Sequence, residues 1–137
     1  MAQNITVGIR EMIDAAEREI ETLSVDQAKE KHGNDEVVFV DIRDVRELNR
    51  DGRMPGAFHC PRGMLEFWID PASPYHKPLF AQDKQFVFFC AGGLRSALAA
   101  HTAQKMGLRP VAHIEGGFGA WKKRGGAVDM EPPPKKG

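Results

Sequence analysis

The chain has 137 residues, of which 42% are hydrophobic and 28% charged, and its 19 Lys and Arg residues balance 19 Asp and Glu residues. This length and composition are typical of one domain with its own core. The zero net charge argues against a general nucleic-acid-binding protein, no apolar run is long enough for a membrane helix, and two cysteines are too few for a disulfide scaffold. These features predict neither membrane nor nucleic acid as a partner. Because the N-terminus also lacks the apolar core of a signal peptide, we expect a cytoplasmic protein.

The N-terminal part of the chain predicts helices. Apolar residues recur every three or four positions over residues 9–23, which is the stripe of an amphipathic helix. This helix is expected either to pack on its own domain or to bind a partner. Ser24 and Gln27 have the spacing of a capping box, which predicts a second short helix through Lys31.

The rest of the chain alternates between predicted strands and predicted helices. Short runs rich in β-branched and aromatic residues predict buried strands over residues 37–41, 85–90 and 110–117. Helical spacing predicts helices over residues 44–51, 63–69, 94–106 and 118–126. Residues 54–61 predict a turn and a short extended piece, and the three prolines of residues 70–78 predict a loop. This alternation is typical of an α/β domain with a largely parallel sheet.

The segment CAGGLRS, residues 90–96, joins a predicted strand to the next helix. Cys90 ends the strand, where open α/β sheets bind their ligands. Gly92 and Gly93 allow a tight turn whose amides can surround an anion, and Arg95 adds a permanent positive charge where the helix begins. All these groups favour the thiolate, which is the nucleophilic form of cysteine. We therefore expect Cys90 to be reactive rather than an inert residue of the core.

This segment resembles the active-site loop of rhodanese-like sulfurtransferases, and three further motifs agree with the resemblance in chain order. They are VDIRDVREL at residues 40–48, GRMPGAFHCP at residues 52–61 and IEGGFGAW at residues 114–121. In the second motif Arg53 replaces the usual His. The resemblance implies an α/β, rhodanese-like fold with a central, mostly parallel five-stranded sheet flanked by helices on both faces.

The resemblance also implies a division of the chain into three parts. The rhodanese-like domain would cover residues 24–126, after an N-terminal amphipathic helical extension over residues 1–23. Residues 127–137 would form a flexible tail, because EPPPKKG at its end contains three prolines and two lysines and cannot pack a core.

The chemistry implied by the resemblance is sulfur transfer. Cys90 would take a sulfane sulfur from a small anionic donor such as thiosulfate, hold it as a persulfide, and pass it to a thiol or to cyanide. No cofactor is expected, because the intermediate is covalent. The loop residues that would surround the persulfide are Ala91, Gly92, Gly93, Leu94, Arg95 and Ser96. The alternative is a sulfur carrier or interaction module whose donor or acceptor is another protein.

Loop length bears on a more distant alternative. Related phosphatases of the cell-cycle type and arsenate reductases need a loop of the form Cys-x5-Arg, whose extra residue widens the cradle for a tetrahedral oxyanion. Here four residues separate Cys90 from Arg95. The shorter loop favours the sulfurtransferase and leaves phosphatase or arsenate reductase activity as a remote alternative.

Three residues outside the loop are expected to support it. In the family, the residues matching Asp41 and Arg43 organise loops beside the active site: the Asp accepts loop hydrogen bonds and the Arg bridges to an acid. Helical spacing makes Glu47 the expected partner of Arg43.

The segment over residues 62–78 is longer than compact members of the family require, and it suggests a wall over the pocket. Phe67, Trp68 and Tyr75 are expected to form this wall, with Arg62, His76 or Lys77 placed to meet an anionic donor at the pocket. The alternative is a packed surface excursion.

The remaining candidates are expected to be structural. Cys60 should be a small apolar filler, with a resolving thiol as the alternative, and Trp121 should fill the core. His59, His101 and His113 have no metal-ligand spacing with cysteines or acids, so no metal is expected.

Overall fold

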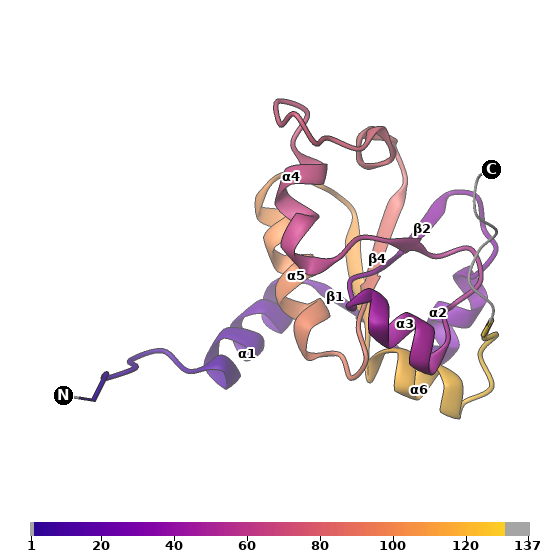
Figure 1. The fold of residues 1–137 in the computed structure, drawn as a ribbon, viewed down its shortest axis with the longest axis horizontal. Coiled ribbons are helices and arrows are strands. Elements are labelled where there is room, and N and C mark those ends of the chain that lie inside the picture. Colours follow the sequence, from indigo (N-terminus) through magenta and orange to yellow (C-terminus); the bar gives the residue numbers. More distant parts are fainter. Residues whose placement is uncertain (1, 131–137) are drawn as a thin grey trace.

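The computed structural model describes residues 2–130 and contains one five-stranded sheet with the strand order β1-β5-β4-β2-β3 (Figure 1). The strands are β1 (Glu21–Leu23), β2 (Val37–Asp41), β3 (Phe58–His59), β4 (Gln85–Phe89) and β5 (Val111–Ile114). The helices are α1 (Ile9–Glu19), α2 (Val25–Lys31), α3 (Val45–Asp51), α4 (Leu65–Ile69), α5 (Leu94–Lys105) and α6 (Gly117–Lys123), with short 3-10 turns at Arg62–Met64 and Pro78–Ala81. Every neighbouring pair of strands is parallel, which confirms the expected fold.

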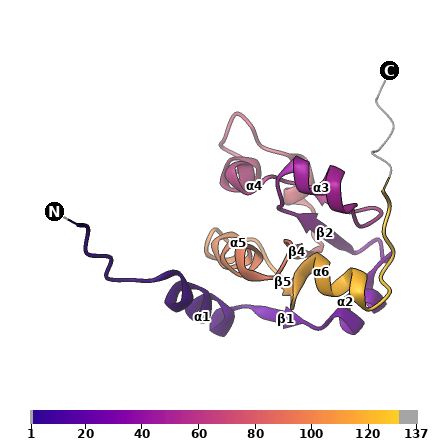
Figure 2. The same cartoon turned by 60° about the horizontal axis from the view of Figure 1, so that its bottom comes forward.

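The apolar strands form this sheet because both of its faces are covered. Along β4, Phe86 and Phe88 belong to one core cluster, whereas Val87 and Phe89 belong to the other. This alternation follows from the period of two in a strand. Figure 2 shows α1, α4 and α5 on one side of the strands and α2 and α6 on the other.

The N-terminal extension differs from the prediction of a helix through residue 23. Helix α1 ends at Glu19, and the backbone becomes extended at Ile20. Residues 21–23 form the edge strand β1, in which Thr22 lies opposite His113 of β5. The free edge of β5 offers backbone partners that one more helical turn would not use, and spacing of apolar residues alone does not show this. The extension is therefore part of the sheet.

The predicted flexible tail is wrong for residues 127–130. Arg53 and Asp129 exchange backbone hydrogen bonds of 2.9 and 2.8 Å, and Trp121 Nε1 donates to the carbonyl oxygen of Ala127 at 2.7 Å. Val128 packs against the core cluster that contains Trp121. The Pro/Lys-rich residues 131–137 lie outside the described part of the chain.

The carboxyl ends of the parallel strands bring three loops together. The Ile42 amide, after β2, donates to the Phe89 carbonyl oxygen at 3.1 Å, and the Phe118 amide, after β5, donates to that of Cys90 at 2.7 Å. Figure 1 shows this edge at the bottom of the sheet, with α3 and α6 nearby. Across residues 2–130, no helix combines the length and the apolar character needed to cross a membrane.

Candidate active site

Cys90 is the first residue of the loop between β4 and α5 and is 1% exposed. Its Sγ accepts hydrogen bonds from the backbone amides of Gly93, at 3.2 Å, and Ser96, at 3.4 Å. The predicted loop thus curves around the sulfur, and the two donor residues flank Leu94 and Arg95 in the sequence. Two amide donors directed at one sulfur stabilise negative charge on it, which is the property expected of a nucleophilic cysteine.

Gly93 is required by the shape of this loop. Its φ of 95° lies in the left-handed region, and it directly precedes α5. A Cβ atom here would lie 3.1 Å from the amide nitrogen of Gly116. The loop can pack this closely against the turn after β5 only because the residue has no side chain.

The first turn of α6 fixes the beginning of the loop. The Phe118 amide donates to the Cys90 carbonyl oxygen at 2.7 Å, and the Gly119 amide donates to the Ala91 carbonyl oxygen at 3.0 Å. The sequence identified this segment only as one of the motifs shared with the family. Its role as an anchor of the reactive loop depends on contact between residues 90–91 and α6, which no local pattern shows.

The expected pairing of Arg43 with Glu47 is wrong. Glu47 instead binds Arg95 through two hydrogen bonds of 2.9 and 3.0 Å, and this contact lowers the pKa of the Glu47 carboxyl. Glu47 also accepts a hydrogen bond of 2.9 Å from the Asp44 amide, so it is held in place at the start of α3. The charge of Arg95 beside the loop is therefore balanced by a carboxylate.

Arg43 turns into the core and pairs with Asp41. The ion pair measures 2.8 Å, both side chains are almost fully buried, and Arg43 Nη2 also donates to the Gly52 carbonyl oxygen at 2.9 Å. The guanidinium lies over the ring of Phe118, 4.2 Å from its centroid. Within residues 2–130, the hydrogen bonds to the Asp41 carboxylate come from Arg43 rather than from the reactive loop. The pair therefore joins the end of β2 to α6, the element that anchors the loop.

Behind the loop lies a buried hydrogen-bond network centred on His113. Ser96 Oγ is 3.0 Å from His113 Nδ1, and both residues are at most 1% exposed. His113 Nε2 lies 3.2 Å from Thr22 Oγ1 and 3.5 Å from Glu17 Oε2. The imidazole thus connects the reactive loop to β1 and α1. The sequence suggested a structural His113 but gave no signal of its contact with Ser96, because the two residues lie on different elements.

We expect His113 to weaken the fold at acidic pH. Burial lowers its pKa, and the nearby Glu17 and Glu115 carboxylates offset only part of this effect. The unfolded chain, whose histidines have a pKa of about 6.5, then binds the proton more readily than the folded protein does. The free energy of unfolding should therefore be highest above that pH and fall below it. In urea titrations at neutral and mildly acidic pH, His113→Gln should lose less stability on acidification than the parent, whereas His101→Gln should match the parent; equal losses in all three would contradict the assignment.

The structure gives the residues expected at the pocket other contacts. Arg62 pairs with Glu66 at 2.8 Å, Phe67 packs edge-on against Tyr75, and Trp68 packs against Phe58. Figure 1 shows α4 running away from the reactive loop toward the loop of residues 70–78 at the top. A role of Arg62, Phe67 or Trp68 at the pocket stays a prediction, and their observed contacts are those of a packed excursion.

Cys60 has the environment of a filler. It is fully buried, and burial raises the pKa of its thiol to about 12. Cys60 follows β3 and Cys90 follows β4, with β2 between them. Two strand spacings amount to roughly 10 Å, beyond the ~7 Å between Cα atoms that a disulfide can bridge. This separation argues against a resolving thiol.

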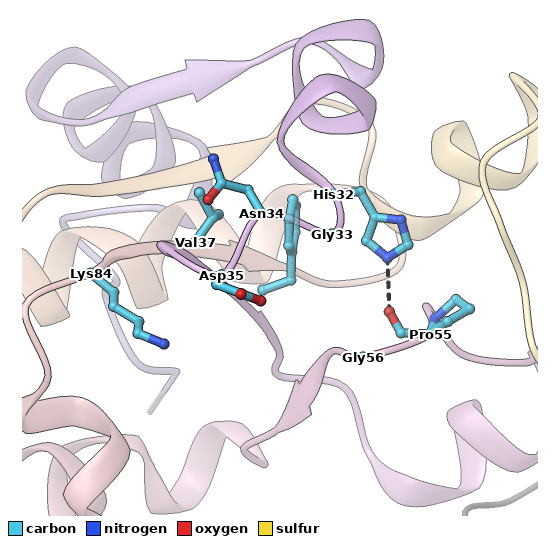
Figure 3. Close-up of a pocket in the computed structure, with 9 residues that line it drawn as sticks. His32, Gly33, Asn34, Asp35, Val37, Pro55, Gly56 and Lys84 are labelled. Carbon is cyan, nitrogen blue, oxygen red and sulfur yellow. Dashed lines mark hydrogen bonds between the residues drawn. The ribbon is translucent and has the colours of Figure 1, made fainter.

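A cavity lined by polar and charged residues lies away from Cys90. It measures about 490 Å³, and its lining includes His32, Asp35 and Lys84. Figure 3 shows the His32 ring directed at the Pro55 carbonyl oxygen, with which it shares a hydrogen bond of 2.8 Å. Since Val37 and Lys84 lie where β2 and β4 begin, this cavity is at the opposite end of the strands from Cys90. Over residues 2–130, no cluster of His, Cys, Asp and Glu is arranged to hold a metal ion.

Known proteins similar to this chain include sulfurtransferases. A thiosulfate sulfurtransferase from Saccharomyces cerevisiae mitochondria, RDL2, is 31% identical over 107 residues, which cover 74% of this chain and 70% of the yeast protein. The thiosulfate sulfurtransferase GlpE of Shewanella oneidensis is 32% identical over 99 residues, covering 72% of this chain and 89% of that protein.

Among the solved structures is a similar protein that is not described as a sulfurtransferase. A Rhodopseudomonas palustris protein of unknown function, described as a possible tyrosine phosphatase, is 64% identical with a TM-score of 0.92, covering 94% of this chain and 99% of that one. The structure of yeast RDL2 is 27% identical with a TM-score of 0.63, covering 82% of this chain and 96% of the yeast chain. The sequence model of the rhodanese-like domain family matches residues 24–124 of this chain. The chain therefore belongs to the rhodanese-like domain family.

Proposed function

We propose that this protein transfers sulfane sulfur through a persulfide on Cys90, with thiosulfate or a related persulfide as the donor. The observation that carries the proposal is the pair of amide hydrogen bonds from Gly93 and Ser96 to Cys90 Sγ. A thiolate held in this way is a nucleophile, and the same amides can stabilise the terminal sulfur of a persulfide. The sulfurtransferase relatives support the reaction class. A cytoplasmic setting, in which free thiols persist, is part of the proposal.

The reaction has two steps that balance without a cofactor. The Cys90 thiolate attacks the outer sulfur of thiosulfate, the sulfur–sulfur bond of the donor breaks, and sulfite leaves with the electron pair. The thiolate of an acceptor, or cyanide, then attacks the outer sulfur of the persulfide. The bond to Cys90 Sγ breaks, and the electron pair returns to Cys90, which regenerates the thiolate.

Phosphatase activity is the second candidate, because the Rhodopseudomonas protein is described as a possible tyrosine phosphatase. The geometry of the reactive loop favours this candidate less than sulfur transfer. With four residues between Cys90 and Arg95, the amides of Gly93 and Ser96 lie within 3.4 Å of the sulfur. A tetrahedral phosphate needs the wider ring of the Cys-x5-Arg loop. We expect no hydrolysis of an aryl phosphate above the rate of Cys90→Ser protein, and turnover comparable to sulfur transfer would overturn the proposed function.

The experiment that tests the proposal is sulfur loading. The reduced protein is incubated with thiosulfate and its intact mass is measured, with released sulfite quantified in parallel. The expected result is a gain of one sulfur atom, reversed by cyanide, with one sulfite per loaded chain. Loading by a protein persulfide but not by thiosulfate would favour the sulfur-carrier alternative instead.

We expect Glu47→Gln to strengthen the binding of thiosulfate. The substitution removes the negative charge that pairs with Arg95 at 2.9 Å, while the amide oxygen of Gln can still accept the hydrogen bond from the Asp44 amide. The unmasked positive charge should lower the KM for thiosulfate about fivefold, as expected for about 1 kcal/mol at a partly exposed site. Steady-state kinetics measure this, with Glu66→Gln, which removes a carboxylate paired with Arg62, as the control. An unchanged or raised KM would show that Glu47 positions Arg95 rather than neutralising it.

A further inference from the structure

An apolar groove of about 270 Å³ lies between α1 and α5, beside the reactive loop. Its lining consists of Ile9, Arg10, Ile13, Leu94, Arg95 and Leu98. Ile9 and Leu94 are 62% and 52% exposed, so large apolar side chains face solvent here. The volume is near the lower limit of small-molecule sites, roughly 300 Å³. The groove therefore suits a small apolar group.

The groove begins at the reactive loop. Leu94 and Arg95 lie between Gly93 and Ser96, whose amides both contact Cys90 Sγ. The Glu47 carboxylate and, to a smaller extent, the nearby Cys90 sulfur raise the pKa of the Arg95 guanidinium. This effect is consistent with the position of Arg95 between the groove and the reactive loop. The groove therefore adjoins the reactive loop through Leu94 and Arg95, which belong to both.

The opposite wall comes from α1, which precedes the part of the chain matched by the family model. Ile13 and Ala16 bury this helix against the core cluster shared with α5, and Gln104 Nε2 donates to the Glu19 carbonyl oxygen at 2.7 Å. The helix is thus fixed by packing. The N-terminal extension therefore supplies one wall of the groove, and α5 supplies the other.

Arg10 adds a charge to the apolar lining. It is exposed, and within residues 2–130 it forms no ion pair. An unpaired guanidinium on the lining can bind a carboxylate with its planar set of donors. The groove therefore complements a molecule with an apolar body and an anionic group.

We propose that this groove binds the sulfur acceptor, and that the acceptor is a small thiol whose apolar chain ends in a carboxylate. The inference rests on the proposed persulfide at Cys90. The acceptor thiolate attacks the outer persulfide sulfur, a new sulfur–sulfur bond forms, and the old bond to Cys90 Sγ breaks with return of the electron pair to Cys90. The apolar chain lies against Ile9 and Leu98, and the carboxylate binds Arg10.

A series of acceptors tests the groove. Protein loaded with thiosulfate and freed from the donor is mixed with mercaptoacetate, mercaptopropionate, mercaptobutyrate or mercaptohexanoate, and loss of the extra sulfur is followed by mass. The second-order rate constant should rise about threefold per added methylene, as expected for burying a methylene group. Mercaptohexanol, which lacks the carboxylate, should react about tenfold more slowly than mercaptohexanoate. Equal rates along the series would overturn the proposal.

Variants locate the effect on α1. Arg10→Gln should remove the preference for mercaptohexanoate over mercaptohexanol, and Ile9→Ala should reduce the dependence on chain length. Arg18→Gln and Met12→Ala are the matched controls, since they make the same kinds of change on α1 outside the groove lining and should leave both dependences intact. Loss of either dependence in the controls would assign it to the helix as a whole and overturn the groove.

A binding measurement separates this inference from the proposed function. Hexanoate has no thiol and cannot accept sulfur, so calorimetric titration into Cys90→Ser protein reports the groove alone. Binding that is weakened about tenfold by Arg10→Gln supports the groove whether or not thiosulfate loads the protein. Absence of binding overturns the groove, whereas failure of wild-type protein to load from thiosulfate overturns the proposed function.

Discussion

A Cys90→Ser variant will gain no sulfur from thiosulfate, whereas a Cys60→Ala variant will load like the parent protein. The serine hydroxyl keeps the shape of the loop but is a far weaker nucleophile than a thiolate, so sulfite release should fall on the order of a thousandfold or more. Cys60 cannot replace it, because burial raises the pKa of its thiol to about 12 and leaves almost no thiolate near neutral pH. Intact mass and sulfite release measure both effects.

The two variants control for each other's structural cost. Both cysteines are buried, so each substitution disturbs the core by a similar small amount. Unfolding curves of both proteins should show a native-like transition. Loading that persists in Cys90→Ser, or disappears in a folded Cys60→Ala, would place the chemistry on Cys60 and contradict the proposed site.

The fold was predictable where one segment holds enough apolar residues to form a strand by itself. The runs that became β2 and β4 are continuous and pair along five positions, from Val37–Gln85 to Asp41–Phe89. In contrast, β3 has two residues and β1 has three, and both exist because a longer neighbour offers a free edge. Such short strands follow from pairing, which a local pattern does not contain.

The candidate site, too, could be predicted only where its residues are close together in the sequence. The loop from Cys90 to Ser96 was identified because its chemistry is contiguous in the sequence. Glu47 and Arg95 are 48 positions apart, and their pairing depends on how α3 meets the loop. Helical spacing predicted that Arg43 would pair with Glu47. The Arg43 guanidinium instead lies in the core, where it contacts Asp41 and Phe118. Burial of an arginine beside its carboxylate partner therefore decided between two pairings that the sequence could not distinguish.

The second large effect is expected from Gly117→Ala, in a residue that touches no substrate. Gly117 has a φ of 62°, and a Cβ atom here would overlap the backbone of Cys90 and lie 2.8 Å from the carbonyl oxygen of Ala91. The left-handed conformation costs an alanine about 1 kcal/mol, and moving the loop backbone adds about 1–3 kcal/mol. We therefore expect the free energy of unfolding to fall by about 2–4 kcal/mol. Because the displaced residues hold the sulfur, the rate of loading should fall on the order of a hundredfold.

Two other glycines separate the clash from the cost of the backbone conformation. Gly125 has a φ of 80° with open space around it, so Gly125→Ala carries the conformational cost alone and should load normally. Gly119→Ala places its Cβ 3.2 Å from the Ala91 carbonyl oxygen without a left-handed φ, and it should lie between the other two. Urea unfolding and loading rates of the three variants measure the series under conditions in which each is folded. If Gly117→Ala loads as fast as Gly125→Ala, contact with α6 does not position Cys90, and the amides of Gly93 and Ser96 alone must hold the loop.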